Sequence, residues 1–356
     1  MPRSLGSLIG NRYVVQRQLT PGGGGEAYLA HDQHENDMVV VKLLSLGALP
    51  PGNPWLEAQA LRHLQDEHIL PIRNADLDSG QPYIVTDVAE YGTLGTLAEA
   101  SHGCGLEVDD VVTFIRDACH GVDRAHRARL IHNDLKPDNL FLNSQRECLV
   151  GDFGGASLIP PGSSAAVPHV TTPNITAPEM AAAWGTPTAT VRSDIYSLGA
   201  TAYWCLAGEL PYQFPPGASF TEKLAIVAAG PPPRLRDRVP HVPKPVAAAI
   251  ERAMSKNPAD RFGSALELAS ALGSRAPAPR RWRQTNEHSG HIRCWRGEPR
   301  RGGSTYLMCL TPGATPKRVV ITTTHASIGR RISAGCREVP ASSWPATVRS
   351  IIKSLL

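Results

Sequence analysis

The pattern of apolar residues changes along the chain from the period of strands to the period of helices, and this change constrains the fold more than any other feature. Between residues 11 and 90, short runs rich in β-branched and aromatic residues are separated by Gly, Pro, Asp and Asn, as is typical of strands and turns. The strand candidates are 12–20, 26–32, 38–44 and 82–88. One segment of this part, 54–65, instead places apolar residues at helical spacing behind Pro54.

From about residue 91 onward, the apolar residues follow the period of an α-helix. The clearest helix candidates are 108–128 and 193–208, in which apolar positions recur three and four residues apart. A chain of 356 residues with 42% hydrophobic and 19% charged residues has the composition of a folded globular protein. The sequence therefore predicts an α+β protein in which a small β-rich part, about 11–90, precedes a larger helical part, about 91–273.

The net charge of +4 hides a strong asymmetry between the body of the chain and its tail. Residues 1–274 contain 21 Lys and Arg against 29 Asp and Glu, whereas residues 275–356 contain 15 against 3. The change coincides with a linker rich in Pro, Ala and Arg at 274–284. We therefore expect a separate basic module over 285–356, whose partner is an acidic protein or another anionic surface.

The tail itself has the pattern of a small α+β module. Strands are predicted over 304–310 and 317–324, and an amphipathic helix over 342–356 with Pro345 near its start. Arginines interleaved with two tryptophans over 280–301 leave nucleic-acid binding as an alternative, although such a run is more often a solvated linker. A zinc site is a weaker alternative, because its candidate ligands lack any paired CxxC spacing. These candidate ligands are His288, His291, Cys294 and Cys309.

Neither export nor membrane insertion is indicated by the sequence. Residues 1–13 lack the apolar core of a signal peptide, and no segment offers about 18 consecutive apolar residues. The seven cysteines are scattered and odd in number, which favours reduced thiols over a disulfide framework. We therefore expect a cytoplasmic protein without a transmembrane segment.

Two features of the β-rich part suit phosphate binding, although each has an ordinary alternative. Four glycines, Gly22 to Gly25, lie between two strand candidates, where they allow backbone N–H groups to approach a phosphate closely. A glycine-rich hairpin turn is the ordinary interpretation. Lys42 lies in an apolar strand, and Glu57 on the helix that follows is its candidate ion partner. Taken alone, both are typical surface residues.

The segment 131–140, IHNDLKPDNL, concentrates polar residues at fixed offsets behind His132. Asp134 can act as a carboxylate base for a hydroxyl group, Lys136 can neutralise a phosphoryl group, and Asn139 offers a hard oxygen to a cation. Asp152 follows in LVGDFGGAS, where a carboxylate between a strand and glycines suits Mg²⁺ beside a nucleotide. Each residue alone fits a capped turn, but independent turns would not produce this order and spacing.

With these motifs in this order, the chain resembles the protein kinase family, in particular bacterial serine/threonine kinases of the eukaryotic type, over about residues 11–273. The resemblance implies the two-lobed kinase fold, with a β-rich N-lobe at about 11–90 and a helical C-lobe at about 91–273. It also implies that residues 132–139 form the catalytic loop and that residues 152–179, from DFG to APE, form the activation segment. The implied cofactors are ATP and Mg²⁺, with Mn²⁺ as a possible substitute for Mg²⁺.

The resemblance assigns a role to each matching residue. Lys42, held by Glu57, orients the α- and β-phosphates of ATP. Asp134 accepts the proton of the acceptor hydroxyl, and Lys136 stabilises the phosphoryl group during transfer. The implied Mg²⁺ ligands are Asn139 and Asp152. The implied ATP-binding residues are Leu19, Thr20, Gly22, Gly23, Gly25, Ala27, Val40, Lys42, Thr86, Asp87 and Ala89. Thr172 and Pro173 match the substrate platform, and the structural residues of the family motifs match Phe153, Gly154, Glu179, Asp194 and Arg261.

Four positions depart from the family pattern. Thr20 replaces the first glycine of the phosphate loop, Ala27 replaces the usual Val, and Val40 replaces the common Ala. We expect these changes around the nucleotide to weaken its binding. Asn133 replaces the Arg between the His and the Asp of the catalytic loop. That Arg normally binds a phosphate on the activation segment, which a neutral Asn cannot do, so phosphorylation there is not expected to switch the protein on.

The implied function is a serine/threonine protein kinase, because the form LKPDN and Thr172 disfavour tyrosine specificity. Two alternatives remain open at this point. A pseudokinase scaffold is suggested by Thr20 and Asn133 but opposed by the filled catalytic positions. A phosphotransferase acting on a small molecule is opposed by TTPNITAPE, the segment that forms a peptide platform in protein kinases.

Overall fold

The structure, a computed structural model, describes fourteen stretches of the chain, and every structural statement below refers to them. These stretches are 3–19, 25–44, 64, 66–101, 103, 105–158, 165–166, 174–182, 188–273, 282–285, 292–297, 306–312, 318–325 and 337–340. The helix candidate 54–65 and the phosphate-loop residues Thr20, Gly22 and Gly23 therefore lie outside the described residues or almost wholly so.

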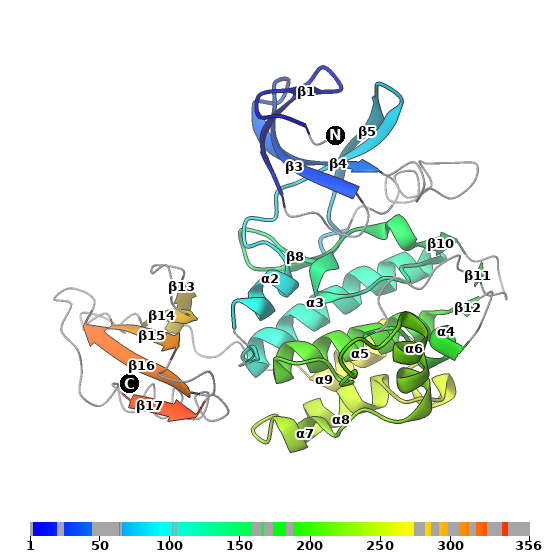
Figure 1. Ribbon diagram of the computed structural model, residues 1–356, viewed down its shortest axis with the longest axis vertical. Helices are drawn as coiled ribbons and strands as arrows, with labels where there is room; N and C mark the ends of the chain where they lie inside the picture. The colour runs from blue at the N-terminus through cyan, green and yellow to red at the C-terminus, as the bar shows by residue number, and fades with distance from the viewer. Residues whose placement is uncertain are drawn as a thin grey trace.

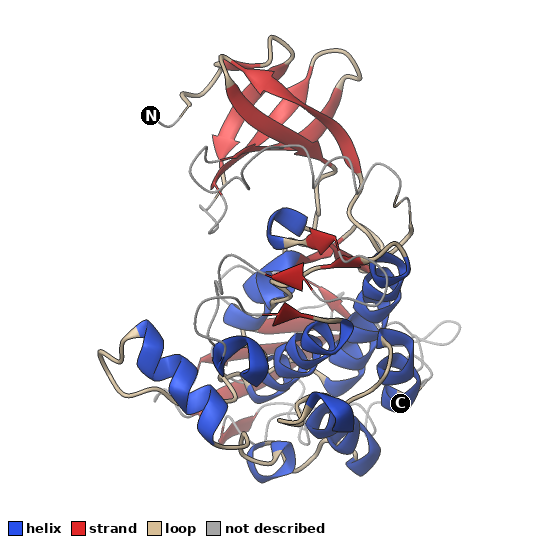
Figure 2. Cartoon of the chain, turned by 90° about the vertical axis from the view of Figure 1, so that its right-hand side faces the viewer, coloured by secondary structure: helices blue, strands red, loops and turns tan. Residues whose placement is uncertain are grey.

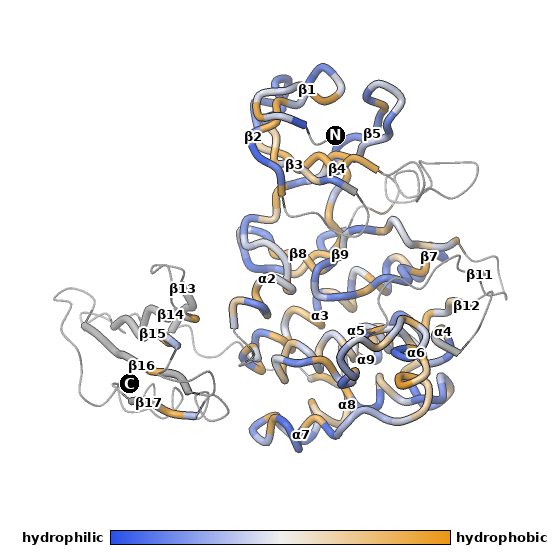
Figure 3. The backbone as a smooth tube through the Cα atoms, in the orientation of Figure 1, coloured by the Kyte–Doolittle hydropathy of each residue, from blue (hydrophilic) through white to orange (hydrophobic). Residues whose placement is uncertain are grey.

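The N-terminal part is an antiparallel sheet of six strands in the order β1-β2-β3-β4-β6-β5 (Figures 1 and 2). Its strands are β1 (Leu8–Ile9), β2 (Tyr13–Gln18), β3 (Gly25–Asp32), β4 (Asp37–Leu44), β5 (Ile72–Asp78) and β6 (Gln81–Thr86). Four of them confirm the sequence prediction. The prediction missed β1, which has only two residues, and β5, whose sequence IRNADLD has no regular alternation. Aromatic and β-branched side chains of the sheet form a separate apolar core, and β4 stands out as apolar in Figure 3.

The second part of the body is helical and is built around one buried helix. Its helices are α2 (Leu94–Glu99), α3 (Val108–Arg127), α4 (Pro178–Ala182), α5 (Val191–Ala207), α6 (Phe220–Ala229), α7 (Leu235–Arg238), α8 (Lys244–Ala253) and α9 (Ala265–Leu272). The predicted helices 108–128 and 193–208 are confirmed as α3 and α5. Because 13 of the 17 residues of α5 are buried, this helix is the centre of the C-terminal core. A polar residue on it is therefore held rigidly.

Two short antiparallel strand pairs carry the loops that connect the two parts. The pair β8 (Leu140–Leu142) and β9 (Cys148–Val150) lies between residues 139 and 151. The pair β7 (Leu130–Ile131) and β10 (Ser157–Leu158) holds the start of the activation segment beside the catalytic loop. A third pair joins β11 (Ala165–Ala166) to β12 (Thr188–Ala189). These ladders fix the ends of both loops.

The tail contains an antiparallel sheet of five strands in the order β13-β14-β15-β16-β17. The strands are β13 (Trp282–Thr285), β14 (Arg293–Gly297), β15 (Tyr306–Pro312), β16 (Arg318–His325) and β17 (Arg337–Pro340). Two of them, β15 and β16, were predicted. Cys294 and Cys309 are direct partners in the ladder between β14 and β15. The predicted helix 342–356 lies outside the described residues, as do His288 and His291.

Two searches of the described residues returned nothing. No helix among them is long and apolar enough to cross a bilayer. No group of three or more His, Cys, Asp or Glu side chains among them is arranged to hold a metal ion. The zinc hypothesis for the tail therefore has no support from the part of the tail that the structure describes.

Candidate active site

Asp134 lies in the loop after β7 and is held by two residues of the same loop. Lys136 Nζ lies 2.6 Å from Asp134 Oδ2. Asn139 Nδ2 donates to the Asp134 backbone carbonyl at 2.7 Å and to its Oδ2 at 3.1 Å. Asn139 is buried at the end of the short helix η2 (Pro137–Asn139), so it provides a fixed support. The carboxylate therefore has a defined orientation before any ligand binds.

Asp152 follows β9 and brings the sheet and the helical part into contact. Its backbone is left-handed, with φ 59° and ψ 64°, at the start of the short helix η3 (Phe153–Gly155). Its Oδ1 accepts a hydrogen bond from Nζ of Lys42 on β4, so the two residues form an ion pair. Burial raises the pKa of Asp152 while the Lys42 ammonium lowers it, and the net result lies below the usual range for Asp. Asp152 is therefore ionised at neutral pH.

The catalytic loop and the segment around Asp152 are tied together by backbone contacts. Gly151 N–H donates to the Asn139 carbonyl at 3.0 Å. His132 Nε2 lies 3.0 Å from the Gly151 carbonyl, and its ring packs on Phe153 with 4.5 Å between the ring centroids. Asn139 and Asp152, which the sequence singles out as Mg²⁺ ligands, are thus brought together. Phe153 is buried, as its structural role requires.

Asp194 on α5 anchors the catalytic loop from below. Its carboxylate accepts the backbone N–H groups of His132 at 2.8 Å and of Asn133 at 2.9 Å. His126 Nε2 lies 2.7 Å from the same carboxylate. Sequence reasoning identified Asp194 but missed His126, which is 68 residues away and lies in the last turn of α3. A polar side chain directed inward from an amphipathic helix was the signal available.

The predicted ATP-binding residues that the structure describes lie on one side of the sheet and on the strand that leaves it. Register pairs Ala27 with Lys42, and Val40 with Thr86. Leu19 N–H donates to the Ala27 carbonyl at 2.8 Å. Two further candidates follow β6. Asp87 pairs with Arg73, and the Ala89 carbonyl accepts the Gly92 N–H at 2.9 Å. Gly25 begins β3.

Three predicted site residues lie outside the described residues: Glu57, Thr172 and Pro173. By contrast, the predicted pair of Glu179 and Arg261 is formed in full. The two guanidinium nitrogens of Arg261 donate to the two carboxylate oxygens of Glu179 at 2.7 and 2.6 Å. This pair holds the end of the activation segment against the helical core. Gly154 lies within η3, beside Phe153.

A β-sheet lobe and a helical lobe, with an ion pair between them and a supported carboxylate on the connecting loop, define a two-lobed protein kinase fold. The comparisons with known proteins agree. Residues 13–271 match the family described as "Protein kinase domain". This match spans well over half of the 356 residues. The chain belongs to the protein kinase family.

Its relatives are bacterial serine/threonine-protein kinases. It is 29% identical to PknF of Mycobacterium tuberculosis over 286 residues, which are 77% of this chain and 58% of PknF. It is 31% identical to PknD of the same organism over 274 residues, which are 75% of this chain and 40% of PknD. The chain thus spans about half the length of these relatives. Among solved structures, the PknI kinase domain of M. tuberculosis covers 76% of this chain and 98% of its own length, at 26% identity and a TM-score of 0.56.

Proposed function

We propose that this protein is a serine/threonine protein kinase that transfers the γ-phosphoryl group of ATP to hydroxyl groups of proteins. One observation carries the proposal: Lys42, Asp134, Lys136, Asn139 and Asp152 meet between the two lobes, although they come from three separate segments. A scaffold that only binds other proteins has no need for this set of charges in one place. The family relation to named serine/threonine kinases supports the same reaction.

The roles follow from the contacts of each side chain. Asp134 is the base: it accepts the proton of the acceptor hydroxyl and orients the oxygen for attack. Lys136, already at its carboxylate, offsets negative charge on the phosphoryl group as it transfers. Lys42 is the cation on the sheet side, where it contacts the α- and β-phosphates of ATP. Binding of ATP therefore replaces part of the contact between Lys42 and Asp152.

The residues at the proposed Mg²⁺ site fit a hard divalent cation. Asp152 is ionised, and Asn139 has its amide nitrogen committed to Asp134, so its carbonyl oxygen is the atom left for a ligand. Oxygen ligands of this type are those that Mg²⁺ prefers in proteins, and Mn²⁺ accepts them too. When bound, the metal neutralises charge on the phosphate oxygens. The side chains of Asn139 and Asp152 hold it at the point where the two lobes meet.

The regulatory part of the proposal concerns Asn133. A neutral amide cannot form the charge-assisted pair that an arginine forms with a phosphate. We therefore propose that activity does not depend on a phosphate in the activation segment.

The proposed function is tested by incubating the purified protein with labelled ATP, Mg²⁺ and a library of Ser/Thr-containing peptides. Wild type is expected to label itself or the peptides on Ser and Thr. Asp134→Asn and Asp152→Asn are each expected to lower the rate by about 10²- to 10⁴-fold without loss of folding by circular dichroism. Asp260→Asn, at an exposed site in η4 (Pro258–Asp260), serves as the control. Wild-type rates in either active-site variant would refute the assignment.

A further inference from the structure

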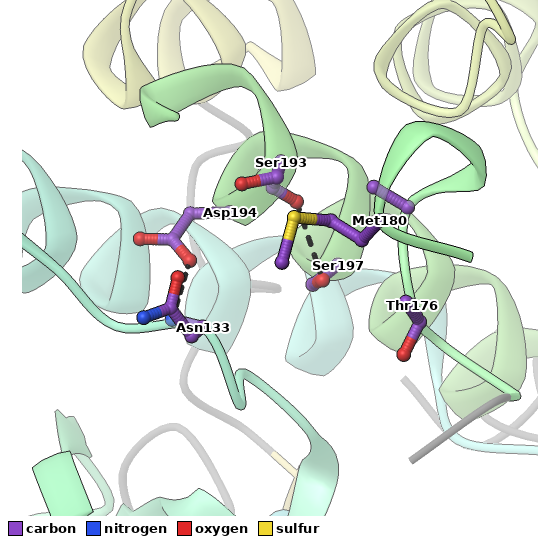
Figure 4. Close-up of a pocket in the computed structure, with 7 residues that line it drawn as sticks. Asn133, Thr176, Met180, Ser193, Asp194 and Ser197 are labelled. Atoms are coloured by element: carbon purple, nitrogen blue, oxygen red, sulfur yellow. Dashed lines mark hydrogen bonds between the residues drawn. The ribbon is translucent and has the colours of Figure 1, made fainter. Parts of the chain in front are cut away.

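Asn133 lies between the base Asp134 and the start of the activation segment, and its side chain is used in full view of both. Its Nδ2 donates to the Gly155 carbonyl at 2.8 Å and to Ser157 Oγ at 3.0 Å. Its backbone N–H is bound by Asp194 at 2.9 Å, as Figure 4 shows. One residue thus links the rigid helix α5, the catalytic loop and the segment that follows Asp152.

The backbone at this position suits Asn better than most residues. Asn133 has φ +67°, in the left-handed region that Asn tolerates several times more readily than other residues with a Cβ. The neighbouring ladder gives the amide its partners, because Ile131 on β7 is paired with Ser157 on β10. Two residues after Ile131, the Asn133 side chain extends this short ladder with two more hydrogen bonds. The β7–β10 pair has only two residues on each strand, so these bonds are a large part of what joins it.

The other face of Asn133 borders the end of the activation segment. A cavity of about 10 Å³, room for one water molecule, is lined there by Asn133, Thr176, Ala177 and Met180, together with Ser193, Asp194 and Ser197 of α5 (Figure 4). Asn133 Oδ1 is buried and has no hydrogen-bond partner among the described residues. A carboxylate at position 133 would add a second negative charge beside Asp194 and would remove both donors.

We propose that Asn133 is a positioning residue for phosphoryl transfer, which fixes residues 155–157 to the catalytic loop through its side-chain amide, with no phosphate group required. The inference rests on the proposed function. Its basis is that the same three-residue stretch 155–157 directly follows Asp152 and Phe153, so freedom in it is transmitted to the carboxylate at the metal site. A neutral hydrogen-bonding clamp thus takes the place of a phosphate-dependent one.

The test separates the amide from the backbone. Asn133→Gly keeps the left-handed conformation available and removes only the side chain, whereas Asn133→Asp keeps the shape and removes the donors. Ser157→Ala removes one acceptor without altering position 133. Each variant, and Asn133→Gly combined with Ser157→Ala, is measured for kcat, for KM of peptide and ATP, for the unfolding midpoint, and for hydrogen exchange of the amides at 153–158.

Asn133→Gly is expected to lower kcat by roughly fivefold to a hundredfold, the range for two neutral hydrogen bonds, with little change in the unfolding midpoint. Exchange at 153–158 is expected to rise. Asn133→Asp is expected to fall further. Ser157→Ala is expected to lower kcat by roughly twofold to tenfold and to add nothing in the Asn133→Gly background, because the same bond is already lost.

Wild-type kcat and exchange in Asn133→Gly would overturn the inference, as would additive effects of the two substitutions. If Asn133→Gly fails to fold, Ser157→Ala still decides, since unchanged exchange in that variant contradicts the clamp. A wild-type protein that transfers no phosphoryl group would refute the proposed function instead. In that case the exchange measurement still shows whether Asn133 holds residues 155–157.

Discussion

Lys42 and Asp152 form an ion pair that joins the two lobes, although they are 110 residues apart in the sequence. Lys42 comes from β4 of the sheet, and Asp152 from the loop after β9. Each of the two is needed elsewhere during the proposed reaction, Lys42 at the phosphates and Asp152 at the metal. The pair therefore keeps two mutually attracting charges ready at one place and releases them to ATP and Mg²⁺ on binding.

Substituting Lys42 by Met is expected to raise the pKa of Asp152. Burial and Lys42 act in opposite directions on this carboxyl, and without the ammonium group burial acts with less opposition. The lowered pKa of Asp152 in the wild type contributes stability above the ordinary pKa of Asp, about 4, and this contribution is lost as the pH falls through the folded-state value. An NMR titration of the labelled carboxyl carbon measures the shift. Lys244→Met, at an exposed lysine of α8, is the control, and an unchanged Asp152 pKa in Lys42→Met would contradict the pairing.

Replacing the remaining hydroxyl residues of the activation segment is expected to leave most activity intact. Asn133 cannot bind a phosphate as an arginine does, so the triple change of Ser163, Ser164 and Thr171 to Ala should lower the rate by less than about tenfold. Ser157 is kept in this variant because its Oγ accepts a hydrogen bond from Asn133. Phosphatase treatment of the wild type provides the matching measurement. A large loss after either treatment would show that a phosphate does control the segment.

Arg261→Lys is expected to destabilise the protein, by about 2 kcal/mol or more. Besides its two bonds to Glu179, the Arg261 guanidinium donates to the carbonyls of Ser255 at 2.7 Å, Arg192 at 2.8 Å and Lys256 at 3.1 Å. An ammonium group has three donors on one nitrogen and cannot reach five acceptors spread around a planar fork. Chemical denaturation measures the loss. The exposed Arg252→Lys is the matched control, and equal stability of the two variants would show that the fork geometry is unimportant.

The sequence predicted those parts of the fold and site that depend on local pattern. Runs of β-branched residues located four strands of the sheet, and the spacing of Asp134, Lys136 and Asn139 located the catalytic loop. Contacts across the fold left no such trace. The bond between His126 and Asp194 spans 68 residues, so only packing of α3 on α5 brings them together. Likewise, the sequence indicated what Asn133 cannot bind, whereas its actual partners depend on the register of β7 and β10.

The kinase domain is expected to fold and act without the tail. The apolar core of the helical lobe ends at Leu272 on α9, and Gly273 terminates that helix with φ +77°. All predicted catalytic residues precede this point. A protein truncated to residues 1–274 should therefore keep its unfolding transition and its rate of autophosphorylation, as measured by calorimetry and labelled ATP. An insoluble truncation would show instead that residues after 274 complete the core of the kinase domain.

The basic tail is expected to bind anionic surfaces through charges that are accessible in the full chain. Residues 275–356 contain 15 Lys and Arg against 3 Asp and Glu, while residues 1–274 contain 21 against 29. Exposed charges lose their attraction as salt shortens the screening length, to about 8 Å at 0.15 M and about 3 Å at 1 M. The full chain should therefore bind a column of anionic resin at low salt and elute later in a salt gradient than the truncation to 1–274, which carries a net negative charge. Adding an acidic protein or a nucleic acid as competitor distinguishes the two kinds of partner. Equal retention of the full chain and the truncation would mean that the tail's charges are already paired within the protein, which would leave no basic surface for a partner.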